Sequence, residues 1–370
     1  MKHRKEIFMA NQASLSKKDT EFREFALHAD MWRVVLYVCA PLALYQSLTQ
    51  IFKIFDSMMA AHISANSVSA VAYLSQINLM LSALGGGLAV GASIKVSEAY
   101  GAGDYMLVKK RVSTLFALCG ILGGGILLVL VPFSSQFLRL AKTPESFIQE
   151  GSRYFILELF GMVISFFNNV YIAIERARGN SKRILHLNLI VIAIKLSLTA
   201  LFVYVLHSGI NMIAVATIVS QSALLLSAVY NLNQKGNAFG FSLSSITMKR
   251  NVVAPMIGLS IPVIIEKTAF AFGKVVINSM STVYDALVVG ALGISNNIGG
   301  FTTSQQNGFQ EGGSAIISQN LGAGNAKRAL EAFKWVFVFC CLIGIVLMSI
   351  TMIFLKQVCW MFAGEDEAFG

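Results

Sequence analysis

Two stretches of the chain decide its fold: residues 85–104, GGGLAVGASIKVSEAYGAGD, and residues 306–325, QNGFQEGGSAIISQNLGAGN. A shift of 221 residues lays the first stretch on the second, and it also lays Pro41 on Pro262. The residues that stay identical are Gly87, Gly91, Ser93, Ser97 and the loop Gly101–Gly103. A helix-breaking proline, a set of small residues and a glycine loop therefore occur twice. In a membrane chain such a repeat is typical of transporters built from two bundles around a central site.

The composition is that of a polytopic α-helical membrane protein. Of the 370 residues, 55% are hydrophobic and 13% are charged, and the mean hydropathy is +0.66. A soluble domain carries about a quarter of its residues as charged side chains. Apolar runs long enough to cross about 30 Å of hydrocarbon as helices recur along the chain. They predict nine transmembrane helices, at residues 33–61, 68–100, 112–133, 147–174, 184–206, 211–230, 253–280, 286–321 and 329–356.

The net charge of +10 follows membrane topology, because Lys and Arg gather in the loops on one side. These basic segments are residues 109–111, 176–183, 235–250 and 327–328, together with the N-terminal tail. The positive-inside rule predicts that this side is cytoplasmic and that the N-terminus lies in the cytoplasm. The charge therefore indicates a multi-pass protein of the plasma membrane, the cell's inner membrane where there are two, and not a nucleic-acid-binding protein.

The five cysteines and five histidines form no pattern that is typical of catalysis or metal binding. The cysteines have no CxxC spacing, and the histidines form no HxxxH or HExxH pair. No nucleophile–base arrangement is visible either. We therefore expect no enzymatic activity and no cofactor.

The repeat divides the chain into four parts. These are a cytoplasmic tail (1–32), an N-lobe of six helices (33–231), a cytoplasmic linker (232–251) and a C-lobe (252–370). Each full unit holds six crossings, so both units have the same orientation and are parallel repeats. The sequence predicts an all-α fold of six plus six helices. The second unit is present only as about three helices, and this pattern predicts a C-terminally truncated chain.

Several segments match one family of transporters. The first helix carries Pro41 and then Asp56 in the segment FDSM, and two loops carry GAGD (101–104) and QNLGAGN (319–325). The segment RARGN (176–180) follows the fourth predicted helix. From Pro41 to its end the chain thus resembles the MATE (multidrug and toxic compound extrusion) antiporters. The resemblance implies two lobes that alternate access and exchange H⁺ or Na⁺ for drugs.

The fifth predicted helix departs from this family. Many prokaryotic members carry an Asn there and, four residues later, an Asp that acts with the first-helix aspartate in cation coupling. The matching positions in this chain are Lys195 and Thr199. One carboxylate of the coupling site is therefore absent, and a lysine stands nearby.

Asp56 is the leading candidate for cation coupling. A charge inside the membrane costs several kcal/mol unless it is paired or hydrated, so those that persist tend to be functional. The resemblance implies that Asp56 binds H⁺ or Na⁺ in the N-lobe and releases it as the helix bends. A Na⁺ ion near Asp56 is the single metal site that the pattern allows. The alternative is a structural ion pair with Lys53, three residues earlier on the same helical face, or with Lys195.

Pro41 and Pro262 occupy equivalent places in the first helix of each unit. Proline removes one internal hydrogen bond and bends the helix. The kinks are interpreted either as mobile hinges or as static features of packing. Glu266 follows Pro262 by one turn, so it is a candidate for a C-lobe cation site or for an ion pair.

Five further polar side chains complete the candidate cavity: Lys53, Lys274, Glu311, Asn168 and Asn169. The two lysines are equivalent in the repeat, and they either line the cavity or extend toward lipid headgroups. Glu311 lies in so polar a stretch that it must face water or protein rather than lipid. The two asparagines either line the cavity or link neighbouring helices.

The sequence thus predicts a multidrug exporter that works as a monomer in the lipid bilayer and takes small lipophilic or cationic substrates. Two alternatives remain open. A cavity dominated by lysines would suit a flippase-like exporter of anionic or lipid-linked substrates. A chain with an incomplete second lobe could instead be a remnant that transports nothing.

Overall fold

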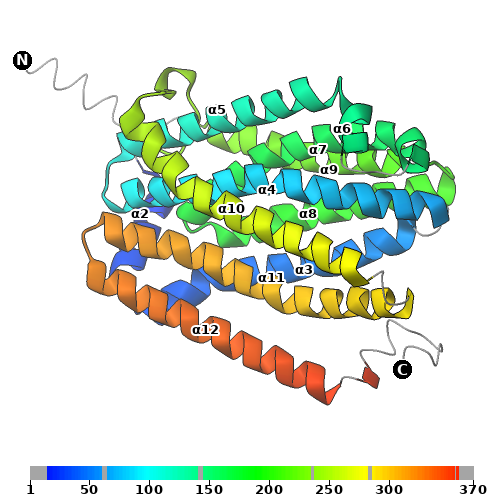
Figure 1. The fold of residues 1–370 in the computed structure, drawn as a ribbon. Helices are drawn as coiled ribbons and strands as arrows, with labels where there is room; N and C mark the ends of the chain where they lie inside the picture. The colour runs from blue at the N-terminus through cyan, green and yellow to red at the C-terminus, as the bar shows by residue number, and fades with distance from the viewer. Residues whose placement is uncertain are drawn as a thin grey trace, which may run out of the picture.

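The computed structural model describes residues 15–60, 65–140, 145–234, 237–281, 286–354, 356 and 357, which form α-helices and the segments that join them (Figure 1). No strand occurs among these residues. The helices are α2 (Lys17–His28), α3 (Met31–Ala60), α4 (Ala65–Gly101), α5 (Tyr105–Leu130), α6 (Ser134–Leu140), α7 (Glu145–Ala177), α8 (Ser181–Ala200), α9 (Asn211–Leu232), α10 (Arg250–Ser281), α11 (Ala286–Gly322) and α12 (Ala326–Ile353). A π-helical turn, η1 (Leu201–Val205), continues α8, and a 3-10 turn, η2 (Leu243–Ser245), lies between α9 and α10.

The nine segments predicted as transmembrane helices are all helical, as α3 to α5 and α7 to α12. Within the described part of the chain, eight of them are long and apolar enough to cross a membrane. The exception is α11, because its middle carries the polar segment 305–311, QQNGFQE. Two helices were not predicted. The short α6 follows α5 almost directly, and α2 is too polar to register as an apolar run.

The prediction that the basic residues 109–111 lie in a loop is wrong. Residues 109–111 belong to α5, which begins at Tyr105 rather than near residue 112. The reason is a cap: Asp104 Oδ1 accepts a hydrogen bond from the Leu107 amide at 2.9 Å and starts the helix early. Arg111 is buried there, and its guanidinium donates to the Lys95 carbonyl.

The helices run side by side in one elongated bundle (Figure 1). We use N-lobe for α3 to α9 and C-lobe for α10 to α12. We call the end of the bundle that carries α2 and the α4–α5, α7–α8 and α11–α12 connections the α2 end, and the opposite end the far end. Both α3 and α10 start at the α2 end, and α4 and α11 return to it, as parallel repeats require (Figure 1). Across the lobes, α10 packs on α4, and α11 packs on both α3 and α4.

The repeated glycines are the places where the two lobes touch. A Cβ added to Gly87 would meet Ile264 of α10, and one added to Gly308 would meet Ala43 of α3, each within 3 Å. The 221-residue shift carries Gly87 onto Gly308 and Ala43 onto Ile264, so the two contacts are equivalent in the repeat. The same symmetry holds for two further pairs of contacts. Gly91 meets Ser260 and Gly312 meets Cys39; Gly101 meets Gln319 and Gly322 meets Glu98.

The repeated loops also fold alike. Gly103 and Gly324 both have left-handed backbones, with φ of 77° and 75°, which glycine adopts without steric cost. The next residues, Asp104 and Asn325, both cap the following helix. The repeat therefore preserves loop geometry and lobe-to-lobe packing, which explains why those residue types recur.

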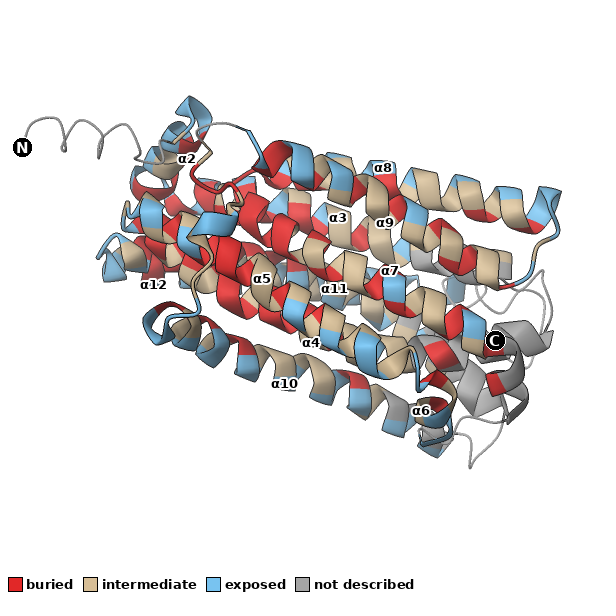
Figure 2. Cartoon of the chain, turned by 90° about the horizontal axis from the view of Figure 1, so that it is seen from above, coloured by how far each residue is buried: buried red, intermediate tan, exposed pale blue. Residues whose placement is uncertain are grey.

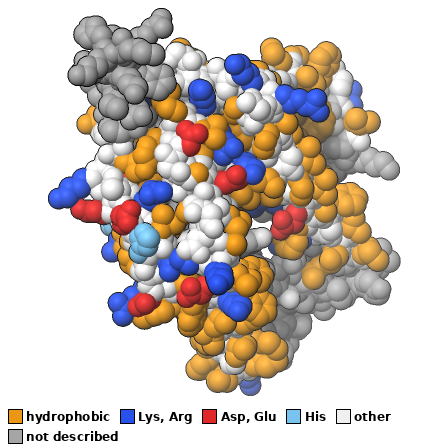
Figure 3. Space-filling model, turned by 90° about the vertical axis from the view of Figure 1, so that its left-hand side faces the viewer, with side chains coloured by type: hydrophobic (Ala, Val, Ile, Leu, Met, Phe, Trp, Pro, Cys, Tyr) orange, Lys and Arg blue, Asp and Glu red, His pale blue; other side chains and the backbone are white. Residues whose placement is uncertain are grey.

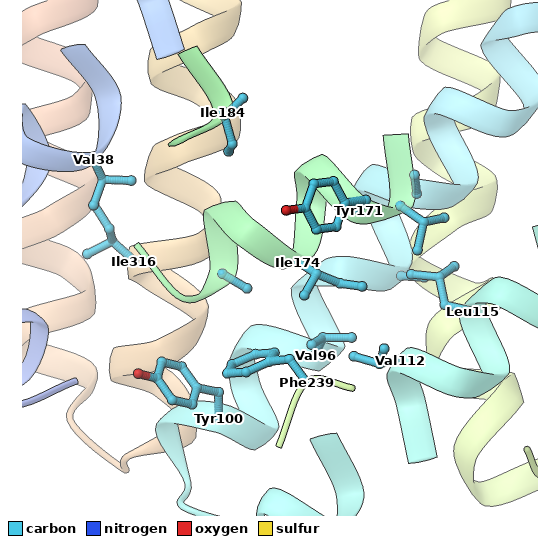
Figure 4. Close-up of a cluster of buried hydrophobic side chains, with 14 of the residues drawn as sticks. Val38, Val96, Tyr100, Val112, Leu115, Tyr171, Ile174, Ile184, Phe239 and Ile316 are labelled. Carbon is cyan, nitrogen blue, oxygen red and sulfur yellow. The ribbon is translucent and has the colours of Figure 1, made fainter. Parts of the chain in front are cut away.

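Buried hydrophobic side chains form two cores. The larger core, next to α2, draws on both lobes: Val38 of α3 lies beside Ile316 of α11, with Val96, Val112 and Ile174 close by (Figure 4). The smaller core contains Leu74, Leu138, Phe155 and Ala214, and all its described members precede α10. Buried residues are densest toward α2 (Figure 2). The lobes thus share a core at the α2 end.

Candidate functional site

The two prolines lie inside helices that continue through them. Pro41 stands within α3, and Pro262 stands within α10 together with Pro255, which the repeat did not single out. The backbone of α3 passes through Lys53 and Asp56, while the side chains of these two residues lie outside the described part. For Asp56, the leading candidate for cation coupling, the structure therefore gives the position in α3 and no side-chain contacts.

Lys195 and Thr199, the two positions that depart from the family pattern, lie on one face of α8. Lys195 is half-buried and Thr199 is fully buried, one helical turn apart. The Thr199 hydroxyl has no hydrogen-bond partner among the described residues, so it is available to a ligand or a water. Helix α8 packs against α3, which carries Asp56. The structure thus places the Lys195–Thr199 face on the helix next to the Asp56 helix.

The remaining polar groups of the N-lobe link helices. Asn168 of α7 is buried, and its Nδ2 donates to Gln221 Oε1 at 2.7 Å and to the Gln221 carbonyl at 2.9 Å, which joins α7 to α9. Asn78 of α4 donates to Glu158 of α7 at 2.7 Å. Asn169 is half-buried and lies beside Gly86 of α4. For Asn168 the linking interpretation is the one that these contacts support.

Glu311 forms an ion cluster that crosses the lobes. Its carboxylate pairs with Arg176 at the end of α7, whose side chain is only 3% exposed, and Lys267 of α10 lies 3.8 Å away on its other side. Sequence reasoning did not foresee this cluster, because Arg176 and Glu311 are 135 positions apart. The signal that existed was the polar stretch around Glu311, which had to face protein or water.

The other two C-lobe candidates do not join this cluster. Glu266 is exposed on α10, so its neighbour Lys267 makes the contact with Glu311 instead. Lys274 is half-buried, and its ammonium lies 5.0 Å from the ring centroid of Phe270. Among the described residues, no group of three His, Cys, Asp or Glu side chains could hold a metal ion.

A two-lobed bundle of membrane-spanning helices, with symmetric contacts between its lobes and charges buried among them, is the architecture of a secondary transporter. The comparison with known families makes this specific. The MatE family model matches residues 41–201 and again 262–369, so the chain belongs to the MatE family of multidrug and toxic compound extrusion transporters. The two matches begin at Pro41 and Pro262, the residues that the internal repeat superposes.

The relatives carry names of multidrug transporters. The chain is 22% identical over 345 residues to the probable multidrug resistance protein YoeA of Bacillus subtilis (strain 168), covering 91% of this chain and 74% of that protein. It is 20% identical to the multidrug export protein MepA of Staphylococcus haemolyticus (strain JCSC1435), covering 92% of this chain and 75% of MepA. The chain thus spans about three quarters of each relative.

Solved structures share the fold. A MOP superfamily transporter from Pyrococcus furiosus Vc1 (DSM3638), described as having a binding pocket of reverse polarity, superposes with a TM-score of 0.87 at 19% identity, covering 96% of this chain and 78% of that one. A MATE family transporter in an outward-facing conformation gives a TM-score of 0.86 at 20% identity, covering 95% and 77%. These matches do not support the predicted C-terminal truncation or a second repeat of only about three helices.

Proposed function

We propose that this protein exports small lipophilic or cationic drugs, driven by a gradient of H⁺ or Na⁺, as a monomer in the plasma membrane. Membership of the MatE family and the names of its relatives support the multidrug substrate class. The two lobes take turns in opening toward either side of the membrane, and cation and drug exclude one another from a shared cavity.

The observation that carries this proposal is the packing of the two lobes against each other toward the α2 end. There the lobes share one core and their symmetric glycine contacts, and the described members of the smaller core all lie in the N-lobe. Charged side chains gather on the surface of the α2 end (Figure 3). By the positive-inside rule we assign this end to the cytoplasm, so that the structure corresponds to a state closed to the cytoplasm.

Asp56 is proposed to bind the coupling cation in the N-lobe. Helix α8 adds to the neighbouring helix surface the Lys195 ammonium and the Thr199 hydroxyl, which has no hydrogen-bond partner within the described part of the chain. A lysine near a carboxylate competes with a bound cation for its negative charge. Release of the cation then leaves a carboxylate that Lys195 can neutralise, which lowers the cost of the empty site.

The test is a variant without the carboxylate. Asp56→Asn should abolish the accumulation of a fluorescent organic cation in everted vesicles that carry an imposed pH or Na⁺ gradient. The matched control is Asp104→Asn. An asparagine at this position can still cap α5, and residue 104 lies in an exposed loop. Equal accumulation by the Asp56 variant and the parent protein would remove Asp56 from the coupling site.

A flippase-like export of anionic or lipid-linked substrates is the second candidate. Lys195, Lys267 and Arg176 favour it, since each places a positive charge within the bundle. The fold match to the Pyrococcus transporter, described as having reverse pocket polarity, is consistent with such a variation. Parallel assays with a fluorescent cation and a fluorescent phospholipid in proteoliposomes separate the two, because each candidate moves only one of them.

A further inference from the structure

Helix α2 lies outside the repeat and outside the family match, and yet it contacts both lobes. Its strongest anchor is a buried ion pair with the N-lobe. Arg178, in the α7–α8 loop, donates from Nε to Asp19 Oδ1 at 2.9 Å and from Nη2 to Asp19 Oδ2 at 2.8 Å. The side chain of Asp19 is 3% exposed. Two parallel bonds between a guanidinium and a buried carboxylate form a strong and directional link.

The Arg178 guanidinium stays charged in this setting. Burial lowers its pKa, but the hydrogen bonds that it donates to Asp19 and the charges of Glu175 and Asp19 raise it, and the net shift is upward. Glu175 also accepts a bond from Arg178 Nη1 at 3.2 Å. The guanidinium of the anchor therefore keeps its positive charge in the physiological pH range.

Three further contacts fix α2 to the N-lobe. The Tyr100 hydroxyl donates to the Asp19 carbonyl at 2.5 Å, and Arg23 Nη2 donates to the Gly101 carbonyl at 2.8 Å, so α2 is tied to the end of α4. Phe22 lies directly against Gly179, where any side chain would collide with the ring. The chain also runs from α2 into α3 within two residues, which adds a covalent tie to the N-lobe.

The C-lobe reaches the other end of the same helix. Arg328 of α12 donates from Nη2 to the Ala29 carbonyl at 2.7 Å and to the Ala26 carbonyl at 3.4 Å, and Asn320 of α11 donates to the Ala26 carbonyl at 3.5 Å. Carbonyls at a helix C-terminus lack partners within the helix and carry partial negative charge. Arg328 of the C-lobe both donates hydrogen bonds to these carbonyls and places a positive charge beside their partial negative charge.

We propose that α2 is a clasp that holds the two lobes together at the α2 end and lets go of Arg328 and Asn320 when the lobes part. This inference rests on the proposed alternation of the two lobes. The clasp is expected to travel with the N-lobe, because the Asp19–Arg178 pair is buried and bidentate, whereas the C-lobe contacts consist of three single bonds to backbone oxygens. Release of the clasp would then precede opening toward the α2 side.

The experiment measures the distance between the lobes at the α2 end. Spin labels at the exposed positions Lys110→Cys of α5 and Ala323→Cys of the α11–α12 loop, in a background without the five native cysteines, report it by double electron–electron resonance. Arg328→Ala removes both hydrogen bonds of Arg328 and should raise the ratio of the long-distance to the short-distance population at least about tenfold, the change that loss of even one hydrogen bond from a charged donor produces. Lys327→Ala, the exposed neighbour with the same loss of charge, should leave the ratio unchanged.

Two more variants make the test decisive. Arg328→Lys keeps a cationic donor and should restore much of the short-distance population. Arg328→Gln keeps an N–H donor without the charge, and it replaces Arg328→Ala if the alanine variant does not elute as folded protein. Identical distance distributions in the parent and in the Arg328→Ala or Arg328→Gln variant would overturn the clasp.

The proposed function is judged separately, by the parent protein alone. Alternating access requires its distance distribution to change with an imposed ion gradient or with a transported cation. If the parent keeps one distance under all these conditions while Arg328→Ala lengthens it, the clasp stands and the alternation of the lobes is refuted.

Discussion

At the residue scale, the Arg176–Glu311–Lys267 cluster is the most consequential feature that the sequence alone could not assemble. Glu311 is 19% exposed, and Arg176 is nearly buried. A buried charge that loses its partner is costly, because the remaining ion is desolvated without compensation. The pair therefore stabilises the contact between the lobes only while both partners are present.

Glu311→Gln is expected to destabilise the closed state by about 2 kcal/mol, since it leaves the Arg176 guanidinium buried beside a neutral amide. The measurement is the Tm of the detergent-solubilised protein, followed by intrinsic tryptophan fluorescence. Glu331→Gln on the exposed surface of α12 serves as the control and should leave Tm unchanged.

A double replacement tests whether the pair or the single charge matters. Arg176→Met with Glu311→Met removes both charges and should recover most of the Tm lost by Glu311→Gln, because well-packed apolar residues commonly replace a buried ion pair at little cost. A double variant less stable than the single one would contradict this interpretation and assign the two residues independent roles.

The same scale shows how far the sequence could predict the site. Asp56 and Lys195 are predicted as site residues because charge inside a membrane is rare and because a family pattern marks their positions. Asp19, Arg178 and Arg328 were not found as site residues, since they lie in or near polar loops where charges are ordinary. Their importance comes from contacts between segments that are far apart in sequence, such as Arg178 with Asp19, 159 positions away.

At the element scale, helices and their symmetry were predictable because apolar length and repeated small residues leave a direct trace in the sequence. The residues at which helices begin were less predictable. The basic residues 109–111 were interpreted as a loop, but the Asp104 cap extends α5 across them. Helix α2 was missed altogether, because contacts with the ends of α4, α7 and α12, rather than an apolar face for lipid, hold it in place.

Glycines in the repeat should be intolerant of substitution where the lobes cross, and tolerant elsewhere. Gly101→Ala places a methyl group against the Gln319 backbone and should cost about 1–3 kcal/mol, as overpacking does. Gly124→Ala in α5 meets nothing within 4 Å and should keep the Tm of the parent or raise it, because alanine favours helix. A Gly101 variant as stable as the Gly124 variant would show that the lobes cross less closely there.

At the scale of the whole molecule, the internal symmetry defines the two lobes that the proposed mechanism moves as units. Equivalent glycines join α4 to α10 and α11 to α3, so the contacts near the α2 end are related by one rotation axis along the helices. In the proposed alternation the lobes rock against each other, so that one end separates while the other closes. The cross-lobe cluster at Glu311 and the proposed α2 clasp both hold contacts that opening of the α2 end would break.

The central claim is that this chain uses an ion gradient to move an organic cation. The most direct measurement is uptake of a fluorescent cation into proteoliposomes of the purified chain, under an imposed pH gradient and, separately, a Na⁺ gradient. We predict accumulation above protein-free liposomes with one of the two gradients and its collapse when an ionophore dissipates that gradient. Uptake equal to that of protein-free liposomes under both gradients, from protein that elutes as a folded species, would contradict the claim.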